Sequence, residues 1–327
     1  MKIAFAGLRH AHIFQLAALA RQHPEIEITG VWEENEEAAA SAQSFFPEKR
    51  YSTYEMLLAD PTVNIVAIGD YYGIRGQRIL QALSAGKHIL TDKPVCTRLD
   101  ELKQIEKLCA EKRLCLGCML DLRYDPAIRL ARDIISSDQI GNIYALSFSG
   151  QHPLQWGTRP QWYFEEGKHG GTFNDIAIHG LDAVQMVTGL PYVKTLCARQ
   201  WNAFAKEAPD FRDCAQFMGE LSNGAGIIAD VSYSAPNNSA FTLPSYWRFT
   251  FWGEDGYLEC HYGEGAVNLA KSTDKHASRI EAPPLSDSCL SDLIREINGE
   301  PTNFDTKSIF FASRKALELQ QFADRKE

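Results

Sequence analysis

Short apolar segments and segments with helical periodicity alternate over the first 120 residues, and this alternation restricts the fold more than any other feature. The apolar segments, which we predict to be strands, lie at residues 2–8, 26–33, 63–70, 87–94 and 113–120. Helical patterns occupy residues 12–22, 35–46, 52–61, 75–86 and 98–112. Strands that alternate with helices form a parallel sheet covered on both faces. Residues 1–120 are therefore predicted to be a Rossmann-like, doubly wound α/β domain.

After residue 120 the pattern becomes that of an α+β domain. A helix at 125–137 and a strand at 142–150 lead into a polar, aromatic loop, and a second helix runs from Asn174 to about Thr188. Alternating runs, typical of strands with one exposed face, follow at 195–202, 214–221, 224–234, 246–253 and 256–262. Two helices, near 290–298 and 305–323, end the chain. Residues 121–327 are predicted to be a second domain with an open-faced, mainly antiparallel sheet.

Composition excludes several classes of protein. A chain of 327 residues with 45% hydrophobic and 23% charged residues is typical of a soluble protein with two domains. The net charge of −9 argues against a nucleic-acid or anionic membrane partner. The sequence has no apolar stretch of about 18 residues, and it begins with a strand pattern rather than a signal peptide. The cytoplasm is the expected compartment, and Cys115 and Cys118, on opposite faces of a strand, are expected to be plain thiols.

The first strand ends in an incomplete dinucleotide-binding turn. Gly7 is present, whereas Arg9 and His12 occupy the other two glycine positions of that motif. The backbone of such a turn holds a diphosphate at a helix N-terminus, and the guanidinium of Arg9 could neutralise that diphosphate. Glu33, which ends the second strand, is placed to accept hydrogen bonds from a ribose. The alternative interpretation is an ordinary strand–helix junction that binds no nucleotide.

Two acidic residues favour NAD over NADP. Glu33 and Glu34 would repel a 2′-phosphate, and no arginine directly follows them to accept it. Arg9 could reach the ribose side and offset their charge.

Lys93 precedes Pro94 at the end of the fourth predicted strand. The carboxyl ends of parallel strands are where ligands of such sheets bind, and proline restricts the backbone beside the lysine. Lys93 is therefore a candidate catalytic residue, and an exposed turn lysine is the alternative.

The helix that begins near Asn174 carries a second candidate group. Asn174 is predicted to cap this helix, and Asp175 and His179 are four residues apart on one face. A carboxylate beside a histidine sets the tautomer and pKa of a proton acceptor. The alternative is a capping aspartate with a surface histidine.

The loop at 151–171 is rich in aromatic and cationic side chains, including Trp156, Arg159 and Trp162. Such residues suit stacking on a sugar ring, and a core or dimer-contact cluster is the alternative. His152, His169 and His179 match no zinc spacing, so a metal is not expected.

Taken in this order, the segments resemble the Gfo/Idh/MocA family of NAD(P)-dependent oxidoreductases over the whole chain. The matching stretches are 82–94, with Asp92 in place of the usual glutamate, 123–143, and 170–182 with its Gly-Gly, Asp and His. The sequence departs from the family after residue 70, where Tyr71 and Arg75 replace a proline and a histidine.

The resemblance implies roles for individual residues. Lys93, Asp175 and His179 would be the catalytic trio, and which of Lys93 and His179 takes the proton stays open. The cofactor would be held by Gly7, Leu8, Arg9, His10, His12, Glu33, Gly69, Asp70, Tyr71, Asp92 and Lys93. The substrate would be held by Arg123, His152, Arg159, Trp162, Asn174 and His179. Family members pair through the open sheet, which implies a homodimer or homotetramer.

The leading hypothesis is hydride transfer between NAD and a hydroxyl or carbonyl carbon of a sugar, polyol or related substrate. One alternative is a lyase or glycoside-cleaving enzyme that recycles NAD with no net redox change. The other is a non-catalytic NAD or sugar sensor.

Overall fold

The computed structural model describes residues 1–237 and 247–325, and these residues divide into two compact units. The first unit comprises Met1–Met119, Pro160–Gly170 and Asp287–Arg314. The second unit comprises Leu120–Arg159, Gly171–Ser286 and the end of the chain from Lys315. The two units are described separately below.

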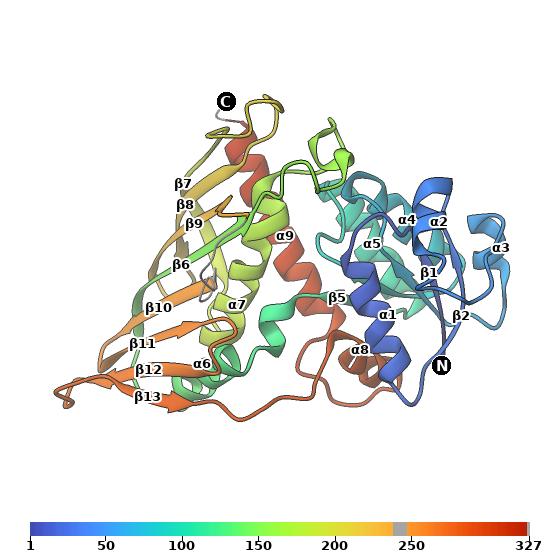
Figure 1. Ribbon diagram of the computed structural model, residues 1–327. Coiled ribbons are helices and arrows are strands. Elements are labelled where there is room, and N and C mark those ends of the chain that lie inside the picture. Colours follow the sequence, from blue (N-terminus) through green and yellow to red (C-terminus); the bar gives the residue numbers. More distant parts are fainter. Residues whose placement is uncertain (238–246, 326–327) are drawn as a thin grey trace. The chain divides into compact units, whose positions relative to one another are not determined.

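A five-stranded parallel sheet forms the centre of the first unit (Figure 1). Its strand order is β2-β1-β3-β4-β5, with β1 at Lys2–Ala6, β2 at Glu27–Trp32, β3 at Ile65–Ile68, β4 at His88–Asp92 and β5 at Leu116–Met119. Every residue of β3 and β5 is buried, as expected for strands covered on both faces.

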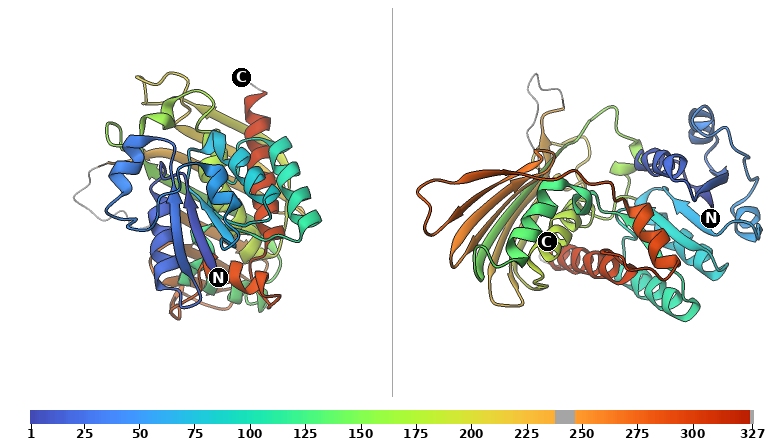
Figure 2. Two further views of the ribbon diagram at one scale, coloured as in Figure 1. Left: turned by 90° about the vertical axis from the view of Figure 1, so that its right-hand side faces the viewer. Right: turned by 90° about the horizontal axis from the view of Figure 1, so that it is seen from below.

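Helices cover both faces of this sheet (Figure 2). They are α1 at His12–Gln22, α2 at Glu36–Ala42, α3 at Tyr54–Ala59, α4 at Tyr72–Ser84, α5 at Leu99–Lys112 and, from later in the chain, α8 at Cys289–Ile297. Helix α1 lies beside α8, and α4 lies beside α5. The predicted doubly wound α/β fold is confirmed.

Two segments that the sequence-based division assigned to residues 121–327 pack in the first unit instead. Leu116 N on β5 donates to Thr306 Oγ1 at 2.9 Å, and Leu293 of α8 covers Gly117. The segment Pro160–Gly170, which contains the short helix η2 at Gln161–Phe164, is joined by a hydrogen bond of 2.8 Å from Gly73 N to Lys168 O. The first break between the units falls after Met119, and the later breaks arise from contacts between distant parts of the chain.

The second unit contains an eight-stranded sheet of order β13-β12-β11-β10-β6-β9-β8-β7. Its strands are β6 at Ile143–Pro153, β7 at Tyr192–Trp201, β8 at Cys214–Leu221, β9 at Gly226–Ala235, β10 at Trp247–Gly253, β11 at Gly256–His261, β12 at Ala266–Lys271 and β13 at Ser278–Glu281. Only β6 and β9 pair in parallel. Strands β12 and β13 were not predicted, and Tyr246, with which one predicted strand begins, lies outside the described residues.

Helices cover one face of this sheet and leave the other face open (Figure 1). Helix α6 at Pro126–Ser136, which follows the short helix η1 at Asp121–Tyr124, packs on β11 and β12, and α7 at Ile178–Thr188 packs on β6. The last helix, α9, spans Thr306–Asp324. Several exposed apolar side chains belong to the strands of this sheet: Tyr144, Val193, Leu196, Met218, Ile228 and Trp252. The predicted open-faced, mainly antiparallel sheet is confirmed.

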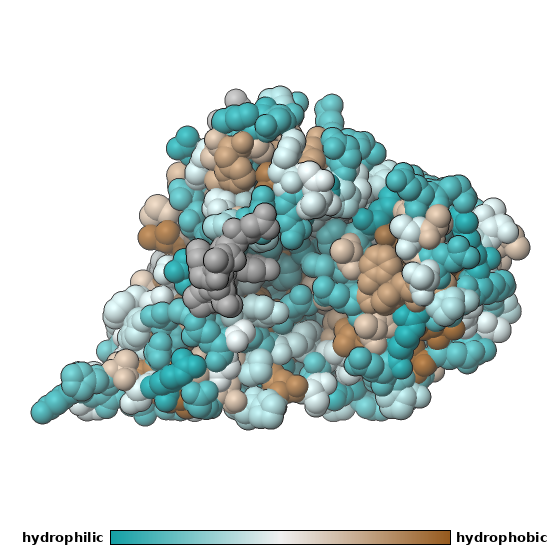
Figure 3. Space-filling view, in the orientation of Figure 1, coloured by the Kyte–Doolittle hydropathy of each residue, from teal (hydrophilic) through white to brown (hydrophobic). Residues whose placement is uncertain are grey.

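Hydrophilic residues cover most of the molecular face drawn in Figure 3, with hydrophobic residues in separate small areas. No helix among residues 1–237 and 247–325 is long and apolar enough to cross a membrane.

Candidate active site

The turn between β1 and α1 has the backbone geometry that a dinucleotide site requires. Gly7 has φ of +72°, and a Cβ atom there would lie 2.6 Å from the Cβ of Asp70, so only glycine fits. Helix α1 begins at His12 with no side-chain cap and no acidic residue in its first turn. Such a helix N-terminus favours an anion. The turn therefore fits a diphosphate, with Gly7, Leu8 and the backbone up to His12 around it.

Glu33 at the end of β2 braces this turn. Its Oε2 accepts a hydrogen bond from Leu8 N at 2.5 Å, and its Oε1 accepts one from Asn35 N at 2.8 Å. Glu33 is 3% exposed, so these bonds satisfy a buried carboxylate. The acidic residue predicted for the ribose thus also supports the backbone that would hold the diphosphate.

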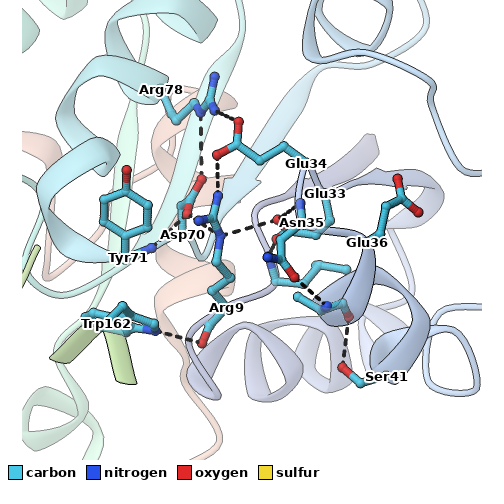
Figure 4. A network of polar contacts seen from close by, with 12 residues as sticks. Arg9, Glu33, Glu34, Asn35, Glu36, Ser41, Asp70, Tyr71, Arg78 and Trp162 are labelled. Carbon is cyan, nitrogen blue, oxygen red and sulfur yellow. Dashed lines mark hydrogen bonds and ion pairs between the residues drawn. The ribbon is translucent and has the colours of Figure 1, made fainter. Parts of the chain in front are cut away.

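Arg9 lies among the carboxylates of Glu33, Glu34 and Asp70 (Figure 4). Its Nε is 3.1 Å from Asp70 Oδ1 and 3.3 Å from Glu33 Oε1, and its terminal nitrogen donates to Glu34 Oε1 at 2.5 Å. Burial opposes its charge, but the carboxylates, Asp70 first, raise the pKa of Arg9 above its usual value. The structure therefore places Arg9 where it offsets the glutamates, which was the alternative to the predicted contact with the diphosphate.

Arg78 of α4 completes this charged network (Figure 4). It donates to Glu34 Oε2 at 2.7 Å and stacks on Trp32, with 4.7 Å from its guanidinium carbon to the ring centroid. Burial raises the pKa of Asp70 to about 6. The guanidinium of Arg9 lies over the ring of Tyr71 at 4.8 Å. Sequence reasoning missed Arg78, which stands 44 residues from its partner.

Asp92, at the end of β4, is fully buried and holds two imidazoles. His10 Nδ1 lies 2.6 Å from its Oδ2, and His12 Nδ1 lies 2.9 Å from its Oδ1. Burial favours the neutral acid, but the two histidines keep the pKa of Asp92 well below its usual value. Burial also lowers the pKa of His10 to about 4, so His10 is a neutral imidazole whose Nδ1–H faces an ionised carboxylate.

In the part of the chain that the structure describes, His10, His12 and Asp92 each offer one atom that could bind a metal ion. These atoms all lie within 4.8 Å of one another. Both contacts to Asp92 are of hydrogen-bond length, and Arg75 lies 3.5 Å from the same carboxylate. His10, His12 and Arg75 therefore surround the charge of Asp92 within the protein, with a hydrogen bond from His12 and close polar contacts from the other two.

Aromatic residues of the segment Pro160–Gly170 pack on this group. The hydroxyls of Tyr72 and Tyr163 each lie 3.1 Å from His10 Nε2 and 2.6 Å from each other. Trp162, predicted to hold substrate, donates its indole N–H to the carbonyl oxygen of Arg9 at 3.4 Å (Figure 4). In this structure Trp162 therefore contacts the cofactor turn.

Lys93 follows β4 directly and is 4% exposed. Its Nζ lies 5.8 Å from the ring centroid of Tyr72, within the range of a cation–π contact. The alternative of an exposed turn lysine is therefore wrong, because this side chain is buried beside the predicted cofactor turn.

In the second unit, Asp175 and His179 lie on a helix with an unusual start. Residues Phe173–Ala177 form a π-helical turn, η3, that continues into α7. Asp175, His179 and Asn174 are all buried. The prediction that Asn174 caps the helix is wrong, because the helical turn begins before it and Thr172 takes the cap position. Gly171 has φ of +94° and faces Gln320, so this turn requires glycine.

Two side chains of the sheet hold the candidate pair. The hydroxyl of Tyr233 on β9 donates to Asp175 Oδ2, and the ring of Trp247 on β10 lies 5.7 Å from that of His179. Tyr233 is 1% exposed and was missed by sequence reasoning. Its place on an alternating strand gave no signal, because its partner is 58 residues away.

Other predicted substrate residues of this unit are engaged in contacts of their own. Arg123 donates Nε and a terminal nitrogen to Asp182 at 2.7 and 2.6 Å, and both residues are buried. Arg159 donates to the carbonyls of Pro153 and Leu154 at 2.9 and 2.6 Å. The ring of His152 lies 5.6 Å from that of Trp247. These contacts give Arg123 and Arg159 a role in shaping the unit.

A cavity of about 270 Å³ opens beside Tyr233. Its lining combines aliphatic, aromatic and polar residues: Leu154, Trp156, Phe204, Ala205, Glu207, Tyr233, Ser234, Ala235, Pro236 and Asn237. This composition suits a small polar ligand with one apolar face.

Comparison with known proteins agrees with these features. Residues 1–119 match the model of the oxidoreductase family with an NAD-binding Rossmann fold, and residues 128–259 match the GFO/IDH/MocA C-terminal domain. Levoglucosan dehydrogenase of Pseudarthrobacter phenanthrenivorans is 30% identical over 157 residues, which are 46% of this chain and 40% of that protein. Glucose-6-phosphate 3-dehydrogenase of Bacillus subtilis is 24% identical over 98% of this chain and 91% of its own.

The chain spans about half the length of the first curated relatives it matches. Among solved structures, levoglucosan dehydrogenase with NADH and levoglucosan has a TM-score of 0.82 at 18% identity, covering 100% of this chain and 98% of that one. The two domain models of one family therefore match this chain in order. The matched residues include the turn, the strand ends and the helix described above. The chain belongs to the Gfo/Idh/MocA family of oxidoreductases with an NAD-binding Rossmann domain.

Proposed function

We propose that the protein is an NAD-dependent dehydrogenase that acts on a CH–OH group of a sugar, polyol or related substrate. The observation that carries the proposal is the turn at Gly7, which requires glycine, opens onto an uncapped helix and is braced by Glu33. The levoglucosan and D-xylose dehydrogenases among the relatives support sugars as the substrate class.

Residues of the chain itself are assigned the proton transfer and the stabilisation of charge. Bound NAD supplies the acceptor for a hydride from the substrate carbon. We assign His179 as the group that accepts the hydroxyl proton, with Asp175 in support, and Lys93 as the cation that hydrogen-bonds the developing alkoxide. General acid–base catalysis of this kind contributes roughly 10²–10⁴-fold to a rate.

NAD is the proposed cofactor in preference to NADP. Three carboxylates, Glu33, Glu34 and Asp70, face two guanidiniums, Arg9 and Arg78, so one negative charge remains near the ribose position. An electrostatic difference equivalent to one pKa unit is about 1.4 kcal/mol, or tenfold in binding. We therefore expect NAD to bind at least about tenfold more tightly than NADP in titrations of the purified protein. Equal affinities would refute this preference.

The proposed assembly is a homodimer or homotetramer in the cytoplasm. The exposed apolar side chains on the open sheet, such as Met218, Ile228 and Trp252, support pairing through this face. Eight free cysteines support a reducing compartment. Light scattering on the purified protein tests the assembly, and a monomer at micromolar concentration would contradict it.

The assay that tests the function follows absorbance of reduced nicotinamide while NAD is incubated with levoglucosan, D-xylose or D-glucose. Stoichiometric NADH from any of them supports the proposal. Product formation without NADH would instead indicate the recycling reaction. Tight NAD binding without either outcome, across a panel of sugars and polyols, would indicate a sensor.

A further inference from the structure

Arg75 of α4 is among the most deeply buried side chains of the first unit, with an exposed fraction of 0%. One terminal nitrogen donates to the carbonyls of Asp92 and Pro94, each at 2.9 Å. The other donates to the carbonyl of Asp70 at 2.9 Å. A single guanidinium therefore holds the backbone on both sides of Lys93 and ties it to the end of β3.

Nearby groups stabilise this buried cation. A charged group in the interior requires hydrogen bonds and an opposite charge to offset its loss of water. Besides the three carbonyls, Arg75 lies 3.5 Å from the carboxylate of Asp92, and its guanidinium carbon is 4.8 Å from the ring centroid of Tyr72. The ring of Tyr72 is also the one that Lys93 Nζ approaches at 5.8 Å. Arg75 and Lys93 thus share their surroundings.

The geometry requires a guanidinium rather than any cation. Arginine offers donors in a rigid planar fork, whereas the ammonium of lysine is a point charge at the end of a flexible stem. Three carbonyls on two different strand ends can be bridged by the fork. A lysine at this position could not bridge all three at once.

A second buried cation provides the structural contrast. Lys87 lies just before β4, at the opposite end of the strand from Lys93, and donates to the carbonyls of Asp60 and Val63 at 2.7 and 2.8 Å. Lys87 is 7% exposed, so it also joins backbone segments in the interior. Its bonds hold a loop and none of the candidate site residues.

We propose that Arg75 is a positioning residue for Lys93: by holding the Asp92–Lys93–Pro94 backbone, it keeps the Lys93 ammonium in the place where it stabilises the substrate oxygen. This inference rests on the role given to Lys93 under the proposed function. A displacement of about 1 Å in a reacting group can cost 10²-fold in rate. Loss of Arg75 should therefore lower kcat by that order.

The test compares Arg75→Met and Arg75→Lys with Lys87→Met as the matched control. With the sugar that gives the fastest NADH formation, we expect Arg75→Met and Arg75→Lys to lose about 10²-fold in kcat, while KM and the Kd of NAD stay within about threefold. Lys87→Met should lower thermal stability and keep kcat.

Hydrogen exchange measured by mass spectrometry separates this inference from the proposed function, because it needs no turnover. Arg75→Lys should accelerate exchange in a peptide covering residues 92–97, and Lys87→Met should accelerate it around residue 63. Unchanged exchange at 92–97, or wild-type kcat in Arg75→Lys, would overturn the inference. An equal loss of kcat in Lys87→Met would overturn it as well, since a general structural role would then explain the effect.

Discussion

The candidate catalytic residues of the first unit and those of the second unit are held in different ways. Lys93 stands at a strand end where Arg75 bonds the backbone and His10 and His12 hold the preceding carboxylate. Asp175 stands in a π-helical turn and receives one hydroxyl, from Tyr233 on a sheet strand. The backbone beside Lys93 is held by several side chains, whereas Asp175 is held by a side-chain contact that comes from a strand of the sheet. Substitutions near Lys93 and substitutions near Asp175 should therefore change activity and stability to different degrees.

The largest expected effect is the loss of the proton acceptor itself. His179→Ala should lower kcat by about 10²–10⁴-fold, because general acid–base catalysis contributes that much. NAD binding should hold, since His179 lies in the second unit and the cofactor turn in the first. Steady-state kinetics and a cofactor titration measure both quantities. Full turnover by this variant would remove His179 from the mechanism.

The residues around Asp92 should make the free energy of unfolding of the first unit depend on pH. The pKa of His10 is about 4 in the folded protein and about 6.5 in an unfolded chain, so between these values the unfolded state binds more protons. Stability should therefore fall as pH decreases from about 6.5 to about 4, by roughly 3 kcal/mol in total. Asp92 contributes below this window, because its folded pKa is depressed.

Urea unfolding at pH 7.0, 5.5 and 4.5 measures this loss. His10→Asn should weaken the dependence of stability on pH, and substitution of the exposed His276 should leave that dependence unchanged. An equally steep loss in His10→Asn would show that other groups cause the acid sensitivity.

A smaller effect is expected from the hydroxyl that holds Asp175. Tyr233→Phe keeps the ring and removes the donor, and a hydrogen bond to a charged group contributes about 1.5–3 kcal/mol, or roughly tenfold or more. We expect kcat to fall about tenfold with little change in the Kd of NAD. Tyr192→Phe is the matched control, because that buried tyrosine of the same sheet donates to Thr195 instead. Equal losses in the two variants would assign the effect to packing.

The smallest effect concerns cofactor choice. Arg9→Gln removes one of the two guanidiniums that offset Glu33, Glu34 and Asp70, so the repulsion of a 2′-phosphate should increase. The ratio of NADP Kd to NAD Kd should rise a few-fold, since a partly exposed ion pair is worth up to about 1 kcal/mol. A lower ratio would mean that Arg9 does not act through charge at the ribose.

The sequence was sufficient for features that depend on local patterns. The five parallel strands and helix α1 were predicted because their apolar patterns are contiguous in the sequence, and Gly7, Glu33 and Lys93 were found because each stands at a strand end. The cap at Asn174 was wrong because propensity cannot show a helical turn that begins earlier as a π-helix. Strands β12 and β13 are too short for their residue pattern to predict them.

Features that depend on distant partners were not predictable. The sequence showed Arg75 only as a departure from the family pattern. Its contacts could not be predicted, because its three acceptors are backbone carbonyls, which carry no sequence signal. The pairing of Arg123 with Asp182 was not predictable, because the two residues are 59 positions apart in the chain. The placement of Pro160–Gly170 in the first unit follows from bonds to Arg9, His10 and Gly73 that no periodicity encodes.

The packing of α8 and Thr306 on β5 has a consequence for biosynthesis. Domains generally fold from the N-terminus as the chain leaves the ribosome. Here, however, Leu116 N bonds Thr306, 190 residues later, and Leu293 covers Gly117. Residues 1–119 therefore cannot complete their interior until nearly the whole chain has been translated. An arrested nascent chain that ends before residue 287 should expose the edge of the parallel sheet to proteases and chaperones, although all five of its strands have already been made.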